Sequence, residues 1–139
     1  VGYIAGVFDL FHIGHLNMFK RAKEQCRYLI VGVVSDEGVR LNKQAEPFVP
    51  FDERIEMVRS CKYVDEAIKL PLDFCGTRDM FKIYHFDVQF SGSDYEHDPA
   101  WLAEKEFLEK NGSTMVFFPY TQSTSSTKLK KAIENRINN

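Results

Sequence analysis

The sequence contains little that would support a disulfide framework, a zinc site or a membrane span. It has three cysteines, Cys26, Cys61 and Cys75, and no CxxC pair, so neither a zinc site nor a disulfide scaffold is predicted. It has no run of eighteen consecutive apolar residues, so no transmembrane helix is predicted. The apolar first ten residues contain Asp9 and follow no basic segment, unlike a signal peptide. These absences predict reduced thiols, no membrane insertion and a cytoplasmic protein.

A strong charge of either sign is also lacking. The chain carries 18 Lys and Arg against 20 Asp and Glu, which gives a formal net charge of −2. A nucleic-acid-binding domain normally has a basic patch or stripe, so no nucleic-acid partner is expected. The sequence has no GxxxxGK(S/T) loop and no Ser-His-Asp order, so it predicts neither a P-loop protein nor a serine hydrolase.

The apolar and aromatic content is sufficient for one folded domain. The sequence is 44% hydrophobic and contains 12 Phe and 6 Tyr, which supply large side chains for a core. A length of 139 residues suits one domain. We therefore expect a single domain over residues 1–139.

Apolar segments of strand length alternate with segments of helical periodicity. The predicted strands are residues 1–8, 28–34, 63–70, 86–90 and 114–118, and the predicted helices are residues 16–25, 52–61, 78–85, 100–110 and 127–137. The alternation predicts an α/β fold, a single doubly wound Rossmann-like domain with a five-stranded parallel sheet. Ligands bind such sheets beyond the carboxyl ends of the strands. We expect the longest loop there, residues 35–51, to be irregular and to serve as an active-site loop.

Two histidines stand where the first predicted strand turns into the first helix. His12 and His15 are separated by Ile13 and Gly14 in the segment GVFDLFHIGH, residues 6–15. A helix N-terminus favours phosphate, and Gly14 lets a phosphate approach the backbone. Both imidazoles can then donate N–H groups to phosphoryl oxygens. The alternative is a histidine that only satisfies a hydrogen bond at the helix start.

A second segment with phosphate-binding chemistry precedes the last predicted helix. Residues 119–128 read PYTQSTSSTK and are rich in Ser and Thr. Ser125 or Ser126 suits the N-cap position, and hydroxyls together with backbone N–H groups can hold the β- and γ-phosphates. Helix capping alone is the alternative.

The segment GVFDLFHIGH resembles the HxGH signature of the nucleotidylyltransferase superfamily, and its GxFDLxHxGH form resembles the cytidylyltransferase branch. Residues 16–37 (LNMFKRAKEQCRYLIVGVVSDE), residues 51–54 (FDER) and residues 62–66 (KYVDE) are similar to that branch as well. The likeness covers nearly the whole chain. In length and in the order of its motifs, the sequence most resembles the glycerol-3-phosphate cytidylyltransferase type.

The resemblance implies transfer of CMP from CTP to a phosphorylated alcohol with release of pyrophosphate. The acceptor would be like glycerol 3-phosphate, phosphocholine or phosphoethanolamine. It also implies Mg²⁺ with the triphosphate, no resident metal site, and a homodimer. Two alternatives stay open: an ATP-using adenylyltransferase of the same superfamily, and a non-catalytic nucleotide-binding module.

The resemblance also assigns residues to roles. The catalytic residues would be His12, His15 and Lys43. Independently of the resemblance, Arg54, whose guanidinium can hold a phosphate, and Arg78 are expected to contact the acceptor, although Arg54 is equally compatible with a structural ion pair to Asp65 or Glu66. Tyr95 and Trp101 would lie near the acceptor or in the core. The nucleotide-binding residues would be Val7, Phe8, Gly14, Asp94, Tyr120, Thr121, Ser125, Ser126 and Thr127.

The sequence departs from the family pattern at several positions, and four of them are considered for their effect on binding. Ala45 and Tyr120 stand where the family has a lysine and an arginine, and Ser93 and Ser123 replace an aspartate and a glycine. The losses of charge favour compensation by Arg78, Arg40 or a neighbouring subunit, or else the non-catalytic alternative.

Overall fold

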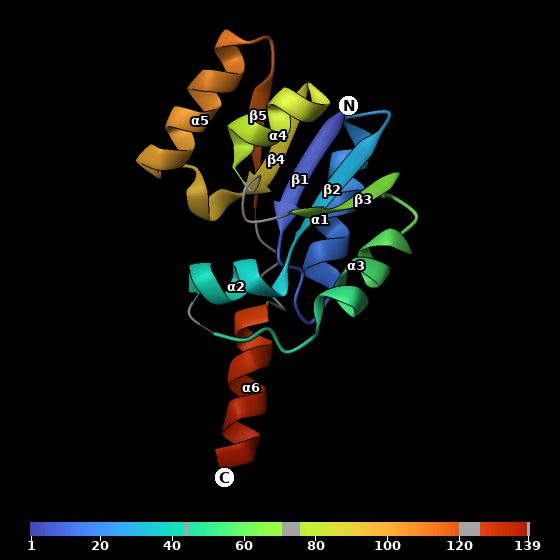
Figure 1. Cartoon of the computed structure of the whole chain (residues 1–139), viewed down its shortest axis with the longest axis vertical. Helices are drawn as coiled ribbons and strands as arrows, with labels where there is room; N and C mark the ends of the chain where they lie inside the picture. Colours follow the sequence, from blue (N-terminus) through green and yellow to red (C-terminus); the bar gives the residue numbers. More distant parts are fainter. Residues whose placement is uncertain (44, 71–75, 120–125, 139) are drawn as a thin grey trace.

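The computed structural model describes residues 1–43, 45–70, 76–119 and 126–138 (Figure 1). Five strands form one sheet: β1 (Gly2–Gly6), β2 (Leu29–Val34), β3 (Glu66–Leu70), β4 (Val88–Gly92) and β5 (Thr114–Phe118). The helices are α1 (Ile13–Glu24), α2 (Asp36–Lys43), α3 (Phe51–Arg59), α4 (Thr77–Tyr84), the 3₁₀ helix η2 (Ser93–Tyr95), α5 (Pro99–Lys110) and α6 (Ser126–Asn138).

All strand pairs are parallel, and the order across the sheet is β3-β2-β1-β4-β5. The chain adds strands in one direction from β1 to β3 and then returns to add β4 and β5 on the other side of β1. The predicted α/β fold with a five-stranded parallel sheet is therefore confirmed. The order reverses between β1 and β4, so a ligand is expected beyond the carboxyl ends of these two strands.

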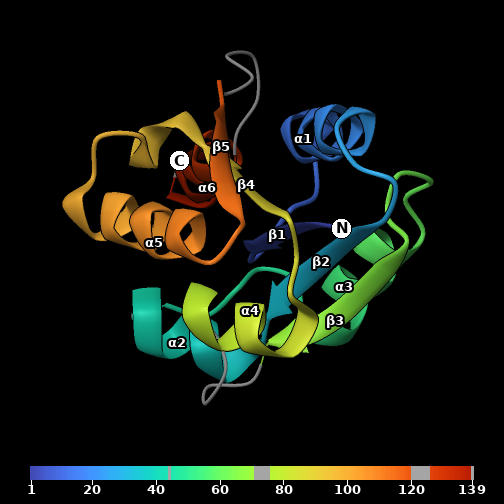
Figure 2. The ribbon, with the colours of Figure 1, turned by 90° about the horizontal axis from the view of Figure 1, so that it is seen from above.

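Helices cover both faces of the sheet (Figure 2). Phe19 of α1 and Val58 of α3 are fully buried in one core cluster, where Phe90 and Phe118 stack with ring centroids 5.2 Å apart. A second cluster on the other face joins the sheet to Met80 of α4 and Leu108 of α5. Two packed layers thus fix the positions of the strand ends that carry the site.

The stretch from residue 35 to 51 is not irregular throughout, which corrects one prediction. The helix α2 occupies Asp36–Lys43. The hydroxyl oxygen of Ser35 accepts from the Gly38 N–H at 3.1 Å, as an N-cap residue does. Two acidic residues, Asp36 and Glu37, lie in the first turn, where the helix dipole favours negative charge. The cap was overlooked because the stretch lacks a long apolar periodicity.

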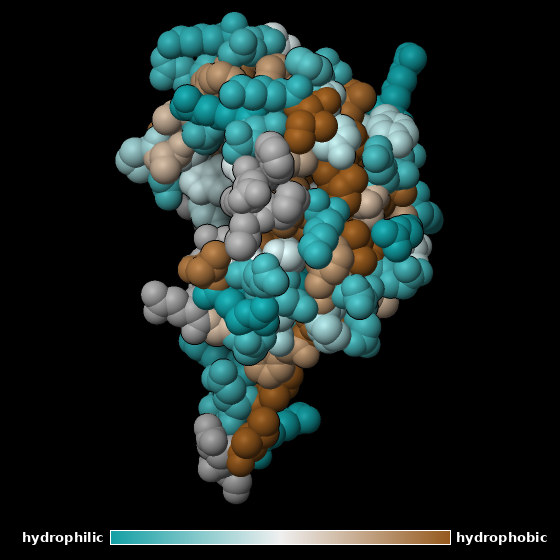
Figure 3. Space-filling view, viewed as in Figure 1, coloured by the Kyte–Doolittle hydropathy of each residue, from teal (hydrophilic) through white to brown (hydrophobic). Residues whose placement is uncertain are grey.

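The last helix extends away from the domain (Figure 1). Apolar side chains follow one side of it (Figure 3), and Ile137 near its end is 75% exposed. Near its start, Leu129 packs beside Phe8 and Val49 around a cavity. Within the described ranges, no helix is long and apolar enough to cross a lipid bilayer.

Candidate active site at the first strand–helix turn

The imidazoles of His12 and His15 lie against each other at the start of α1. Their ring centroids are 4.0 Å apart and their planes differ by 29°. His12 is the N-cap residue, and its Nδ1 atom accepts from the Gly14 N–H at 3.0 Å. The Nδ1 atom of His15 in turn accepts from the His12 N–H at 3.3 Å. The two rings therefore form a reciprocal capping box, a role usually filled by Ser or Thr with Glu.

This hydrogen bonding fixes the protonation of both rings. A nitrogen that accepts from a backbone N–H carries no proton, so each neutral ring keeps its proton on Nε2. Burial, and next the neighbouring His12 ring, lower the pKa of His15 to about 3, while the Asp9 carboxylate opposes this shift. Burial also lowers the pKa of His12. Near neutral pH the site thus offers two uncharged Nε2–H donors.

The aromatic ring of Phe8 supports His15 from the strand side. The Phe8 ring meets the His15 ring edge-on, with centroids 5.4 Å apart. The Phe8 backbone has φ of 56°, a left-handed conformation that is uncommon for an aromatic residue. A Cβ atom at Gly6 would lie 2.7 Å from Phe8 Cζ. The strand β1 consequently ends at Gly6, two residues before its predicted end, and the turn begins there.

Asp9 is a buried carboxylate within this turn, and no role for it was predicted from the sequence. It is 2% exposed and accepts from the backbone N–H groups of Phe48 at 2.8 Å and Val49 at 2.9 Å. The Lys130 ammonium of α6 lies 3.0 Å away. Burial raises the pKa of Asp9, but these donors outweigh it and hold the pKa below its ordinary value. The sequence feature that could have indicated this role is an acidic residue within an otherwise apolar segment.

The start of α1 faces the carboxyl ends of β4 and β5. Gly14 and Arg21 of α1 line a cavity of about 30 Å³ together with Gly92, Phe118 and Pro119. The histidines therefore lie at the edge of the sheet where a ligand is predicted, next to the carboxyl end of β4.

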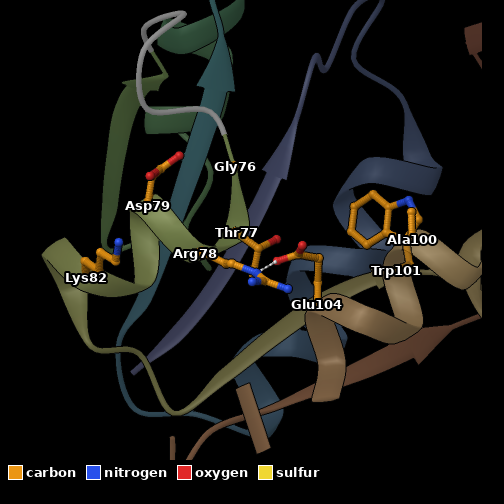
Figure 4. A pocket seen from close by; sticks show the side chains of 8 residues that line it. All are labelled: Gly76, Thr77, Arg78, Asp79, Lys82, Ala100, Trp101 and Glu104. Carbon is orange, nitrogen blue, oxygen red and sulfur yellow. Dashed lines mark hydrogen bonds and ion pairs between the residues drawn. The ribbon is translucent and has the colours of Figure 1, made fainter. Parts of the chain in front are cut away.

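A larger pocket opens at the same edge of the sheet, on the other face (Figure 4). Its volume is about 500 Å³, within the usual range for small-molecule sites. The helix α4 follows the carboxyl end of β3, and α5 follows the carboxyl end of β4, so the N-terminal ends of both helices border it. The lining residues are Gly76, Thr77, Arg78, Asp79, Lys82, Ala100, Trp101 and Glu104.

A family model described as cytidylyltransferase-like matches residues 3–132. The chain belongs to the cytidylyltransferase-like family. It is accordingly a transferase of the nucleotidyltransferase class, and the family resemblance stated from the sequence is confirmed.

Curated relatives of this cytidylyltransferase-like chain fall into two groups. An FAD synthase of Thermococcus kodakarensis is 37% identical over 139 residues, which cover 96% of this chain and 89% of that protein. An ethanolamine-phosphate cytidylyltransferase of Dictyostelium discoideum is 41% identical over 97% of this chain, which spans 38% of that longer enzyme. A glycerol-3-phosphate cytidylyltransferase of Bacillus subtilis is 32% identical over 92% of each chain.

A solved structure shares the fold. It is the lipopolysaccharide core biosynthesis protein from Thermoplasma volcanium, with a TM-score of 0.69 and 25% sequence identity. The superposition covers 88% of this chain and 97% of that one.

Arg54 of this cytidylyltransferase-like domain has a structural environment, which corrects the expectation of an acceptor contact. The residue is 1% exposed. Its guanidinium donates to the carbonyls of Val49, Val7 and Val34 at 2.7–2.8 Å and to the Asp36 carboxylate at 2.6 Å. Four of its five N–H groups are thereby used, and they tie β1, β2 and α3 together.

The alternative ion pair for Arg54 was also assigned to the wrong partner. Asp65 binds Lys23 instead, and Glu66 accepts from the Tyr28 hydroxyl at 3.1 Å. The ends of β2 and β3 hold these acids away from Arg54, a separation that sequence distance does not reveal.

The other predicted site residues are distributed along the same edge. Arg78 lines the α4–α5 pocket, whereas Arg40 pairs with Glu46 at 3.0 Å. Lys43 ends α2, Asp94 lies in η2, and Ser126 and Thr127 open α6. The predicted residues Tyr120, Thr121 and Ser125, with Ser123, lie outside the described residues.

Proposed function

We propose that this protein transfers CMP from CTP to the phosphate of a phosphorylated alcohol and releases pyrophosphate. The observation that carries the proposal is the pair of neutral imidazoles at the N-terminus of α1, both with Nε2–H groups available for phosphoryl oxygens. The similarity to glycerol-3-phosphate and ethanolamine-phosphate cytidylyltransferases supports the choice of CTP and of this acceptor class. We place the reaction in the cytoplasm.

In the proposed reaction, an oxygen of the acceptor phosphate attacks the α-phosphorus of CTP. A new P–O bond forms there, and the bond from the α-phosphorus to the bridging oxygen of the β-phosphate breaks. The electron pair leaves with pyrophosphate. The attacking phosphate oxygen is already ionised, so no general base is needed. His12 and His15 donate Nε2–H bonds to the oxygens on which charge accumulates.

The remaining phosphates would be held by cationic and hydroxyl groups around this turn. We assign Lys43 and the start of α6, Ser126 and Thr127, to the triphosphate, together with Tyr120, Thr121 and Ser125. Backbone groups of Val7, Phe8 and Gly14, and Asp94, would contact the nucleotide. A helix start is favourable for phosphate because its first N–H groups lack partners.

We propose that Mg²⁺ enters with the triphosphate. Across the described residues, no group of three His, Cys, Asp or Glu is placed to hold a metal ion. Phosphate oxygens and water can satisfy most of the coordination that Mg²⁺ requires, so the proposed ion needs few protein ligands. The bound ion would neutralise charge on the β- and γ-phosphates.

A second candidate is an ATP-using enzyme. It is favoured by the similarity to the FAD synthase of Thermococcus kodakarensis, which this chain matches over 89% of its length. The same imidazole pair would then stabilise adenylyl transfer to a phosphate such as that of FMN. A third candidate, a nucleotide-binding module without turnover, follows from the missing charges at Ala45 and Tyr120.

The test compares CTP, ATP, GTP and UTP by thermal shift in the presence of Mg²⁺, followed by pyrophosphate release. We expect the largest shift with CTP, and pyrophosphate release only when a phosphorylated alcohol is present. A larger shift with ATP, together with FMN-dependent release, would support the second candidate instead. Binding with no release for any acceptor would support the third.

We also propose a homodimer, as the family resemblance implies. Light scattering after size exclusion should give twice the 16.1 kDa of one chain. A mass of one chain at micromolar concentration would reject the dimer without affecting the chemistry.

A further inference from the structure

The α4–α5 pocket, lined by the eight residues named above, lies at the ligand edge and is not explained by the imidazole pair. The inference drawn from it rests on the proposed function, because it concerns the acceptor of that reaction. The pocket and the histidines are linked through one segment of chain. Gly92 lines the cavity beside Gly14, η2 follows it, and Tyr95 of η2 stacks on Trp101 of the pocket.

Arg78 contacts two side chains of α5 at the wall of this pocket (Figure 4). Its Nε atom donates to Glu104 at 3.2 Å, and its guanidinium lies 4.8 Å above the Phe107 ring centroid. In the described part of the chain, only Nε of this group is engaged in a hydrogen bond. The two Nη atoms are therefore left to donate toward a ligand, and the second carboxylate oxygen of Glu104 is left to accept.

Trp101 provides one flat apolar surface on the opposite side (Figure 4). Its ring stacks on Tyr95 with a centroid distance of 4.5 Å and an interplanar angle of 28°. Tyr95 covers one face of the indole, which leaves the other face for the pocket. The ring is thus held in place before any ligand arrives, and this lowers the entropy lost on binding.

The start of α4 adds backbone donors to the same space. Gly76 is the N-cap residue and, over the described residues, no side chain caps this eight-residue helix. Thr77, Arg78 and Asp79 of the first turn line the pocket, so the first N–H groups of α4, which lack intrahelical partners, lie at its wall. The charged lining residues are two cations, Arg78 and Lys82, and two acids, Asp79 and Glu104, so the lining has no net charge.

We infer that this pocket binds the carbon skeleton of the acceptor, and that the skeleton is an uncharged polyhydroxylated chain or ring, a polyol or sugar phosphate. Adjacent hydroxyls both donate and accept hydrogen bonds, which matches the alternation of guanidinium, carboxylate and hydroxyl groups. The C–H face of such a skeleton packs on the open face of Trp101. Its phosphate lies outside the pocket, toward the imidazole pair.

A cationic amino alcohol fits this lining less well. Quaternary ammonium groups are usually bound within several aromatic faces, whereas Trp101 is the single aromatic residue among those that line the pocket. Asp79 and Glu104 would attract such a ligand and Arg78 and Lys82 would repel it, so the lining gives a cation no net electrostatic attraction. The pocket therefore predicts discrimination against phosphocholine and phosphoethanolamine.

The first test measures pyrophosphate release by the full chain with CTP, or with ATP if that proves to be the better nucleotide. The acceptors are glycerol 3-phosphate, ribitol 5-phosphate, ribose 5-phosphate, phosphocholine and phosphoethanolamine. We expect kcat/KM for the best polyol or sugar phosphate to exceed that for both amino-alcohol phosphates at least tenfold. A higher kcat/KM for either amino-alcohol phosphate would overturn the inference and leave the proposed function standing. No release with any acceptor would instead remove the proposed function.

The second test locates the acceptor. Glu104→Gln and Trp101→Leu should each raise the KM for the acceptor at least fivefold, with the KM for the nucleotide within twofold of wild type. Trp101→Phe keeps a flat ring and should restore most of the affinity. Glu106→Gln is the matched control, because Glu106 pairs with Lys110 on the outer side of α5. If Glu104→Gln and Trp101→Leu melt as wild type and keep its acceptor KM, the pocket is not the acceptor site.

Discussion

The ammonium of Lys130 lies 3.0 Å from the carboxylate of Asp9, so a cation of the last helix pairs with a nearly buried acid in the first turn. The same carboxylate receives two backbone N–H bonds from Phe48 and Val49. The Asp9 side chain thus joins three parts of the chain, which are the histidine turn, the segment that precedes α3, and the helix α6. Three segments that are distant in sequence depend on its charge.

Removal of this carboxylate should destabilise the fold. Asp9→Ala removes the acceptor of two backbone N–H groups and the carboxylate that pairs with Lys130, and we expect the free energy of unfolding to fall by about 3 kcal/mol. Urea denaturation followed by circular dichroism measures it. Lys130→Met should cost less, roughly 1 kcal/mol, because the N–H bonds to Asp9 remain. Lys131→Met, at an exposed position of the same helix, is the control, and a loss as large as that of Asp9→Ala there would contradict the assignment.

The buried hydrogen bonds of Arg54 should contribute to the stability of the fold. Arg54→Met leaves Asp36 and the carbonyls of Val7 and Val34 without their donor, and we expect a loss of about 3 kcal/mol or more. Arg54→Lys should recover only part of it, since an ammonium cannot reproduce the planar set of donors. The exposed Arg59, which pairs with Glu56 on the surface of α3, provides the control variant Arg59→Met. An Arg54→Met protein that unfolds at the wild-type urea concentration would disprove this role.

The imidazole of His15 should contribute to turnover more than to folding. His15→Ala removes one Nε2–H donor, and we expect kcat to fall roughly 100-fold, about 3 kcal/mol of transition-state stabilisation. Steady-state pyrophosphate release gives the value. His85→Asn is a suitable control, because His85 ends α4 with φ of 48° and Asn tolerates that conformation. Near-wild-type kcat in His15→Ala would exclude this imidazole from the reaction.

The lowered pKa of His15, about 3, predicts how stability changes with pH. Between pH 7 and pH 5 the unfolded chain takes up a proton at this residue, whereas the folded chain does not. Stability therefore falls as the pH falls, by roughly 2 kcal/mol for an unfolded pKa near 6.5. The lowered pKa of His12 acts in the same direction. Urea titrations at pH 7 and pH 5 measure how much unfolding free energy each protein loses. The loss in wild type should exceed that in His15→Gln by this amount, and equal losses in the two proteins would refute the prediction.

The sequence predicted elements well where hydrophobic periodicity decided them. The strand Thr114–Phe118 has its predicted bounds, and α5 begins one residue early, at Pro99, because Asp98 caps it. Periodicity did not reveal α2, whose start depends on one hydroxyl of Ser35. Boundaries that are set by a single cap escape a search for apolar repeats.

The site was predicted in part for a related reason. The spacing of His12 and His15 indicated that they act together, and the structure brings their rings to 4.0 Å. A histidine hydrogen-bonded at the helix start was one of the two alternatives, but the reciprocal capping box that fixes the protonation of both rings was not predicted, because histidine is seldom a cap. Apart from Val49, which is five positions from Arg54, the structural partners of Arg54 and Asp9 lie 18 to 121 positions away in sequence, so only the folded chain reveals them.

The close contact of Phe8 with Gly6 limits how this part of the chain can vary over evolution. Every residue except glycine adds at position 6 a carbon atom in the space of the aromatic ring, and that ring is what His15 rests on. Even the single methyl group of an alanine at position 6 would therefore displace the Phe8 ring and, through it, His15 of the candidate active site. In a saturation library selected for turnover, we expect glycine alone to survive at position 6.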